Sequence, residues 1–143
     1  MAKYYFFIIV FLITSFTYAD SNIQIDKLMT SNQCIGCNFS DLELKKLNLW
    51  NFDISKSDFS KSNLTKTNFQ GSNLSFSTFN SSVLLGAQFQ GVNFDNSLLL
   101  NVKATASSFI GASLINAKLN NSDFRGADMQ SINFVNGEAI GAD

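Results

Sequence analysis

The chain has 143 residues, including 15 Phe but neither Pro nor His, and charged residues make up only 15% of it. Ten Lys and Arg oppose eleven Asp and Glu, so the formal net charge is −1. A nearly neutral chain does not provide the basic surface that binds nucleic acid, and its aromatic content argues against disorder. Without His, neither a Ser-His nor a Cys-His nucleophile can form.

The first 19 residues have the pattern of an export signal. Lys3 provides a positive start, residues 4–16 form an apolar run broken only by Thr14 and Ser15, and Thr17 and Ala19 are small. We therefore predict a signal peptide over residues 1–19, cleaved after Ala19, and an exported protein in the periplasm or outside a bacterial cell. The run is shorter than the roughly 20 residues of a comfortable membrane span, and an uncleaved anchor is the alternative. Cleavage removes one of the ten basic residues, which leaves nine against eleven acidic ones, a net charge of −2.

Residues 20–36 are predicted to form an N-terminal cap segment. Within it, residues 23–33 have the pattern of a short helix, with Ile25, Leu28 and Met29 on one face. The ends of a repeat protein expose core side chains and backbone edges, so a helix here would cover the first repeat.

Cys34 and Cys37 lie where this segment meets the repeats, both at positions that the period described below turns inward. Three interpretations are open. A structural disulfide suits an exported chain, and two packed thiols would act as small hydrophobic side chains. A redox or metal-binding pair lacks a surrounding βαβ pattern, and a zinc site lacks two of its four ligands. We predict no cofactor and no metal.

From Phe39 onward the sequence has a period of five. We call the large residue of each unit position i. Every fifth residue from Phe39 to Ala139 is Phe, Leu, Ile or Met, except Ala104 and Ala139, and no insertion breaks the register. All Phe residues after the signal except Phe52 and Phe76 occupy this position. A strand alternates every two residues and a helix every 3.6, so neither element places these side chains on one face.

The neighbouring positions suggest a coil with four short sides. Position i−2 is usually Ser, Ala or Thr, position i−1 is often Asn or Asp, and the remaining positions are rich in residues that favour turns. Each unit would then direct one large and one small side chain inward and end in a turn. Stacked coils would pair about 4.8 Å apart and bury ladders of large side chains along a dry axis. The predicted core ladder is formed by Phe39, Phe59, Phe79, Leu99 and Leu119.

These units resemble the pentapeptide repeat proteins, whose unit is written A-(D/N)-L-x-x. Clear copies are Ala127-Asp128-Met129-Gln130-Ser131 and Ser72-Asn73-Leu74-Ser75-Phe76. The resemblance covers residues 37–141 and implies an all-β fold over residues 37–143. This fold is a right-handed quadrilateral parallel β-helix with about five coils. The chain departs from the pattern where Ser replaces Ala at i−2, where Leu42, Leu47 and Phe52 occupy that position in the first coil, and at Ala104 and Ala139.

The outward positions are the candidates for binding. One vertical line carries Trp50, Gln70, Gln90, Ile110 and Gln130 and has no Lys. Val83, Leu85, Leu98 and Leu100 are predicted to form an exposed apolar patch, which often marks an interaction site. The alternative is that these are surface residues that merely favour β structure. A homodimer through the C-terminal coil is a further hypothesis.

The sequence therefore favours a non-catalytic structural or protein-interaction module with an unknown protein partner. We expect no nucleic-acid binding and no stable membrane insertion after signal cleavage. Some members of the family that the chain resembles mimic DNA and bind type II topoisomerases, but that activity requires a strongly acidic rod. A thiol oxidoreductase using Cys34 and Cys37 would require an exposed thiol of low pKa, whereas the register buries both cysteines.

Overall fold

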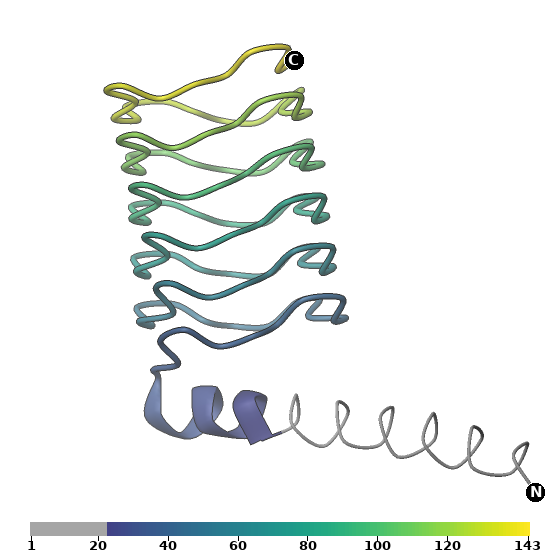
Figure 1. The fold of residues 1–143 in the computed structure, drawn as a ribbon, viewed down its shortest axis with the longest axis vertical. Helices are drawn as coiled ribbons and strands as arrows, with labels where there is room; N and C mark the ends of the chain where they lie inside the picture. The colour runs from purple at the N-terminus through teal and green to yellow at the C-terminus, as the bar shows by residue number, and fades with distance from the viewer. Residues whose placement is uncertain (1–22) are drawn as a thin grey trace, which may run out of the picture.

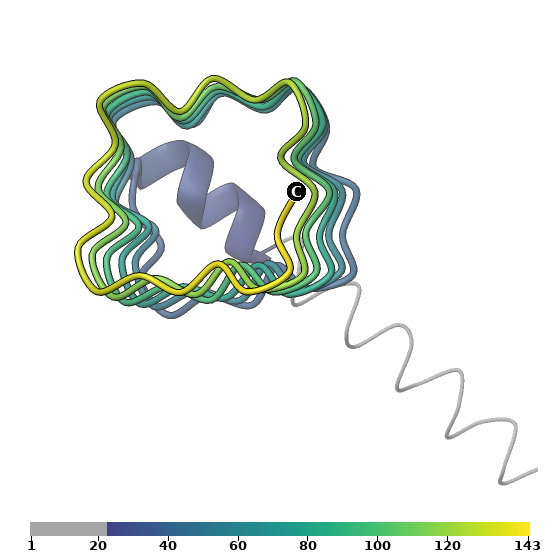
Figure 2. The same ribbon diagram turned by 90° about the horizontal axis from the view of Figure 1, so that it is seen from above.

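The computed structural model describes residues 23–143, and the predicted signal peptide lies outside these residues. The described chain is a rod in which a short helix lies below a stack of coils (Figure 1). Each coil is nearly square when it is viewed along the rod (Figure 2). Within residues 23–143, no helix combines the length and apolar character needed to cross a membrane.

The coils are joined by parallel pairing between residues 20 apart, such as Asp58 with Thr78 and Thr78 with Leu98. The pairing consists of isolated bridges, one on each side of the square, so continuous strands do not form. The N–H at position i bonds upward and the N–H at i−1 bonds downward: Phe59 donates to the Thr78 carbonyl at 2.7 Å, and Asp58 donates to that of Cys37 at 2.9 Å. This alternation satisfies both neighbouring coils and fixes a register of four five-residue units per coil.

The corners of the square are tight turns with a left-handed residue at position i+2. Seven Gly have positive φ, and so do non-glycine residues such as Lys66 (φ 59°), Phe76 (φ 60°) and Asn96 (φ 60°). The turn is closed by bonds such as that from the Ser62 N–H to the Phe59 carbonyl at 3.1 Å. A positive φ at the third residue is the requirement of a type II turn, which explains why Gly and Asn are common at this position.

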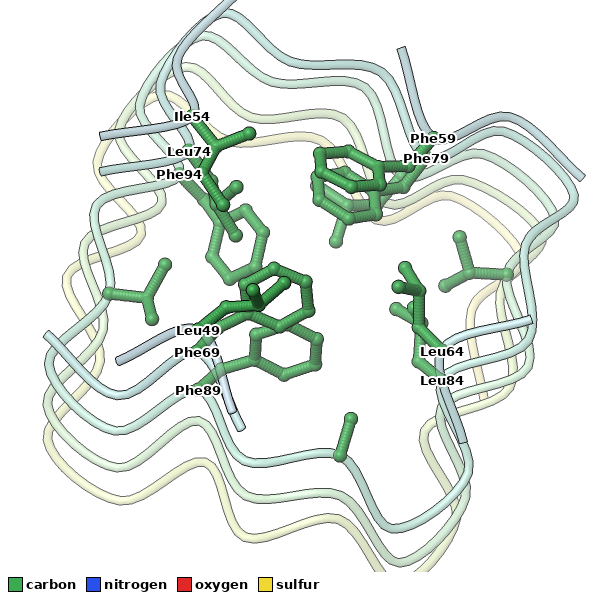
Figure 3. Packing of buried hydrophobic residues seen from close by; sticks show 14 of the residues in the cluster. Leu49, Ile54, Phe59, Leu64, Phe69, Leu74, Phe79, Leu84, Phe89 and Phe94 are labelled. Carbon is green, nitrogen blue, oxygen red and sulfur yellow. The ribbon is translucent and has the colours of Figure 1, made fainter. Parts of the chain in front are cut away.

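The core consists of four vertical ladders, one for each side of the square (Figure 3). We number the faces by their ladders. Face 1 carries Phe39, Phe59, Phe79, Leu99, Leu119 and Ala139; face 2 carries Leu44, Leu64, Leu84, Ala104 and Phe124; face 3 carries Leu49, Phe69, Phe89, Phe109 and Met129; face 4 carries Cys34, Ile54, Leu74, Phe94, Leu114 and Phe134.

Phenyl rings stack within a ladder and meet edge-on between ladders. The ring centroids of Phe59 and Phe79 are 4.8 Å apart at an interplanar angle of 11°, and Phe79 meets Phe94 of face 4 at 73°. The predicted ladder residues Phe39, Phe59, Phe79, Leu99 and Leu119 are all buried. Because one coil advances by about 4.8 Å, an aromatic ring at i meets the ring above it at a favourable stacking distance.

Ser at position i−2 has a specific role, because its hydroxyl often enters the turn of the coil below. The Ser72 hydroxyl accepts from the Phe52 N–H at 3.0 Å and donates to the Leu49 carbonyl. Ser57 makes the same two bonds with Cys37 and Cys34. At Ser57 and Ser72 the buried hydroxyl thus replaces the direct turn bond with a bridge between coils, so that Ser takes the place of Ala there without leaving an unpaired polar group.

The N-terminal end is covered by a helix over residues 23–31. Asn32 ends it in the left-handed conformation (φ 54°), which is common just beyond a helix C-terminus. Leu28 is buried and Ile25 packs against the core, whereas Met29 is exposed. The prediction that Met29 shares the inward face is therefore wrong. Met29 is only one residue, about 100° around the helix, from Leu28, so a narrow contact strip excludes it.

The C-terminal coil lacks a large residue on face 1, where Ala139 is exposed. The ring of the face 4 residue Phe134 occupies the space that a Cβ atom at Gly137 would need, so a larger residue there would require this ring to move. Ala104, the other weak position, is fully buried beneath Phe124.

Candidate functional site

Cys34 and Cys37 are joined by a disulfide, with their Cα atoms 5.7 Å apart. Both residues are buried, between the helix and the first two coils. The Ser57 hydroxyl bridges the same turn by accepting from the Cys37 N–H and donating to the Cys34 carbonyl. Burial and bonding give this pair the position of a structural link and hold it away from an external redox partner.

The predicted apolar patch lies around the corner between faces 1 and 2. Leu98 and Leu100 flank the face 1 ladder, and Val83 and Leu85 flank the face 2 ladder one coil lower. Leu85 is 39% exposed, and the other three residues are partly buried. Leu100 and Val83 lie on either side of this corner, whereas Leu98 and Leu85 lie at the outer edges of faces 1 and 2, and only Leu85 is exposed.

Phe76 is a further exposed apolar residue that the sequence reasoning did not single out. It occupies the corner that leads into face 1, with 58% of its surface exposed and φ at 60°. A bulky residue pays a steric cost in this conformation, and burial of its ring does not offset the cost. Nearly all Phe residues after the signal occupy position i, and Phe76 does not. This departure from the period was the feature of the sequence that could have singled it out.

Face 3 carries the fewest charges of the four faces and the most amide side chains at i+1. Its i−1 positions carry Asn48, Asn68, Gln88, Ser108 and Asp128, and its i+1 positions carry Trp50, Gln70, Gln90, Ile110 and Gln130. We call this surface the amide face. Asp128 is its only charged side chain, and Trp50, with 56% of its surface exposed, stands at its lower end.

The strongest electrostatic feature is an exposed pair on face 2. The Arg125 guanidinium contacts the Asp123 carboxylate at 2.8 and 2.9 Å, and the Asp143 carboxylate lies 3.8 Å from Arg125 Nε. The side-chain hydrogen bonds from Arg125, supported by its backbone N–H, hold the pKa of Asp123 well below its usual range and raise that of Arg125. An exposed two-residue pair of this kind orients a turn and does not form a catalytic cleft.

Among residues 23–143, no three His, Cys, Asp or Glu side chains lie close enough to hold a metal ion. The carboxylates here occupy turn positions instead. Asp58, for example, accepts a bond from the Ser60 N–H two residues later at 2.8 Å. This local pairing is typical of Asp and Asn in turns.

The geometry defines a β-helix solenoid built from five-residue units with a sealed apolar axis. The sequence model described as pentapeptide repeats matches residues 33–71, 57–96 and 107–143, with 8 copies. The chain therefore belongs to the pentapeptide repeat family. No curated protein matches the chain.

Solved structures of the same class are similar in fold. Rfr23, a pentapeptide repeat protein from the cyanobacterium Cyanothece 51142, has a TM-score of 0.61 and 19% identity over 85% of this chain and 93% of its own. HetL of Nostoc sp. strain PCC 7120, involved in heterocyst differentiation regulation, has a TM-score of 0.72 and 21% identity over 76% of this chain and 46% of its own.

A pentapeptide repeat protein from the thylakoid lumen of Arabidopsis thaliana has a TM-score of 0.66 and 22% identity, and the match covers 67% of each chain. At these identities the likeness concerns the fold alone, which is a right-handed β-helix solenoid. The match to HetL spans less than half of that protein's length.

Proposed function

We propose that this chain is an exported, non-catalytic protein-interaction module that binds a protein partner through the patch of Val83, Leu85, Leu98 and Leu100. The observation that carries the proposal is a rigid, hydrogen-bonded rod on which these apolar side chains occupy outward positions of two adjoining faces. A solenoid needs no apolar residue at i−1 or i+1 for its own stability, because the core is complete at i and i−2.

Phe76 extends the proposed surface. It stands two residues before Thr78, which pairs with Leu98 of the coil above, so its corner adjoins the Leu98 edge of face 1. Aromatic side chains are enriched at the centres of protein interfaces, where they bury a large area at low entropic cost. Phe76 stands at the corner between faces 4 and 1, and Leu85 lies beside the corner between faces 2 and 3, so a partner must span faces 1 and 2 to cover both side chains.

Export and the absence of catalysis are also part of the proposal. Export is supported by the pattern of residues 1–19 and by the Cys34–Cys37 disulfide, a bond that persists in oxidising compartments. DNA mimicry is not favoured, because a net charge of −1 leaves little acidic excess. Thiol oxidoreduction is not favoured, because both sulfurs are buried and bonded.

The test is affinity capture from the exported fraction of the source cell with purified protein as bait. Leu85→Asp combined with Leu98→Asp should lose the partner proteins that the wild-type chain retains. Ile110→Asp is the matched control, since Ile110 is as exposed as Leu85, both at 39%, but lies on face 3. Retention of the same proteins by the patch variant would refute the proposed surface.

A homodimer through the C-terminal coil is a second, independent proposal. Phe134 and Ile132 of the last described coil are only partly buried, whereas their equivalents in the middle of the rod are fully covered. A second copy would cover them. A molecular mass that stays monomeric across a hundredfold range of concentration would refute it.

A further inference from the structure

We propose that the amide face binds a neutral, extended glycan, as a site separate from the apolar patch. The inference goes beyond the proposed protein interaction and depends on different residues. It rests on three observations about face 3: its lack of charge, its supply of unpaired amide groups beside one exposed Trp, and its margin of small residues.

The composition of the amide face disfavours two other classes of polymer. Nucleic acid requires rows of Lys and Arg to neutralise phosphates, whereas face 3 carries neither at i−1 or i+1 and has only Lys46 and Lys66 at its corner with face 2. Protein interfaces are enriched in aromatic residues, Met and Arg, whereas this face offers one Trp at its end and one Ile. The face complements an uncharged, hydroxyl-rich ligand, because amides both donate to and accept from hydroxyl groups.

The amides differ in how far the protein itself uses them. Asn68 donates to Asn48 at 3.0 Å and accepts from the Gln70 N–H at 2.9 Å, so this part of the ladder is structural. By contrast, the side chains of Gln70, Gln88 and Gln130 are exposed and make no hydrogen bond within residues 23–143. A ligand can engage these three groups without breaking a bond inside the rod.

Two buried polar atoms near the middle of the face also lack partners. Gln90 Oε1 and Ser108 Oγ are two of only three such side-chain atoms among the described residues. Ser108 lies directly above Gln88, and Gln88 and Gln90 flank Phe89 in the same five-residue unit. The two unpaired atoms therefore lie in adjacent coils of face 3. A buried polar atom without a hydrogen-bond partner costs stability. If a rotamer change brought Gln90 Oε1 or Ser108 Oγ to the surface, a hydroxyl-rich ligand would supply the missing hydrogen bond.

The edge of the face leaves room for a long ligand. The corner between faces 3 and 4 is formed by Asn51, Gly71, Gly91, Gly111 and Ser131. A Cβ atom added at Gly91 or Gly111 would meet no atom within 4 Å, whereas one added at Gly71 would meet the Asn51 side chain. The edge is therefore open beside Gln90 and Ile110, and Asn51 borders it at the Trp50 end.

Trp50 and the coil spacing complete the match to a glycan. An exposed indole offers an apolar plane with a polar N–H, which suits stacking against one face of a pyranose ring. The amides repeat with the coils, at about 4.8 Å, close to the length of one sugar unit in an extended β-linked chain. Trp50 and Gln130 are four coil steps apart, about 19 Å, so a hexasaccharide is long enough to cover the whole face.

The test uses the fluorescence of Trp50, which is the only Trp in the chain. The purified wild-type protein is titrated with cellohexaose and, in parallel, with the hexamer of N-acetylglucosamine. We expect a saturable change in emission with at least one of these probes at millimolar concentration. We expect weaker binding of a sulfated hexasaccharide, since the i−1 and i+1 positions of the face carry Asp128 and no cation, and Lys46 and Lys66 border only its lower end.

Variants separate binding by the amide face from an unrelated effect. Gln70→Ala combined with Gln88→Ala should weaken binding about tenfold or more, because two hydrogen bonds are lost. Ser60→Ala combined with Thr78→Ala on face 1 is the matched control and should bind like the wild type. Calorimetry should show the same weakening for Trp50→Ala, which has no fluorescent reporter.

Three results would overturn the proposal. They are no saturable change with either neutral hexasaccharide, equal binding of the sulfated probe, and equal weakening in the face 1 control. Because none of these residues belongs to the apolar patch, failure here leaves the proposed protein interaction untouched.

Discussion

We expect the same substitution, Ser to Ala at position i−2, to have opposite effects on stability at Ser72 and Ser82. Ser72 and Ser82 both occupy position i−2, both are buried, and they lie in the middle of the rod. Ser72 bonds to the Phe52 N–H and the Leu49 carbonyl, whereas the Ser82 hydroxyl has no partner. Replacement by Ala therefore removes two hydrogen bonds in one case and an unpaired polar group in the other.

The magnitudes follow from these contacts. Two bonds are worth about 2 kcal/mol at about 1 kcal/mol each. After Ser72→Ala, however, the Phe52 N–H can bond directly to the Leu49 carbonyl, as the Val92 N–H does to that of Phe89 at 3.2 Å. We therefore expect a loss of about 1 kcal/mol for Ser72→Ala. Ser82→Ala should gain about 1 kcal/mol, because an unsatisfied buried hydroxyl costs about 1–3 kcal/mol.

The assay is urea denaturation followed by circular dichroism, with the wild type and both variants in parallel. A change of midpoint at constant slope would report stability alone. The result that would refute the reasoning is a shift of the same sign and size in both variants, since the hydroxyl contacts would then not control stability.

Other predictions follow from the corners, the disulfide and the exposed ion pair. Phe76→Gly should stabilise the protein by about 1 kcal/mol, and Gly91→Ala should destabilise it by a similar amount. The reason is that both residues have positive φ at open corners, where Gly is unstrained and a residue with a Cβ atom is strained. Thermal unfolding would measure both changes. Reduction of Cys34–Cys37 should lower the free energy of unfolding by about 2 kcal/mol for so short a loop, and a Cys34→Ser, Cys37→Ser variant should not respond to reductant. The folded-state pKa of Asp123 is depressed, so its contribution to stability is present above its unfolded pKa of about 3.9 and is lost as pH falls further. Arg125→Gln should raise that pKa in an NMR titration, and an unchanged value would show that Arg125 is not its cause.

The sequence predicted the repeat because the period is enforced at every coil. A residue at position i must meet the dry axis, and a single insertion would turn all later side chains outward, so the pattern persists from Phe39 onward. Position i+2 was predictable as a turn for a similar reason, since Gly and Asn tolerate the left-handed conformation at least cost.

Other features depend on contacts that the five-residue pattern does not specify. Ser57 bridges two coils while Ser82 does not, although both occur at i−2, because the outcome depends on the turn 20 residues below. Met29 matched the helical pattern but is exposed, since the width of the contact strip is set by the coil it covers. On the amide face, Asn68 bonds to Asn48 of the coil below, whereas the Gln88 side chain has no such bond. This difference also depends on how the coils stack.

Residues 20 apart lie one above the other in adjacent coils, and engineered disulfide cross-links between coils test this stacking most directly. Asn63 and Val83 form such a pair at outward positions of face 2, whereas Asn63 and Thr78 lie on different faces. Coils about 4.8 Å apart meet the requirement of a disulfide for Cα atoms about 4.4–6.8 Å apart. We predict rapid oxidation of Asn63→Cys with Val83→Cys and none of Asn63→Cys with Thr78→Cys. Equal cross-linking of both pairs would contradict this stacking.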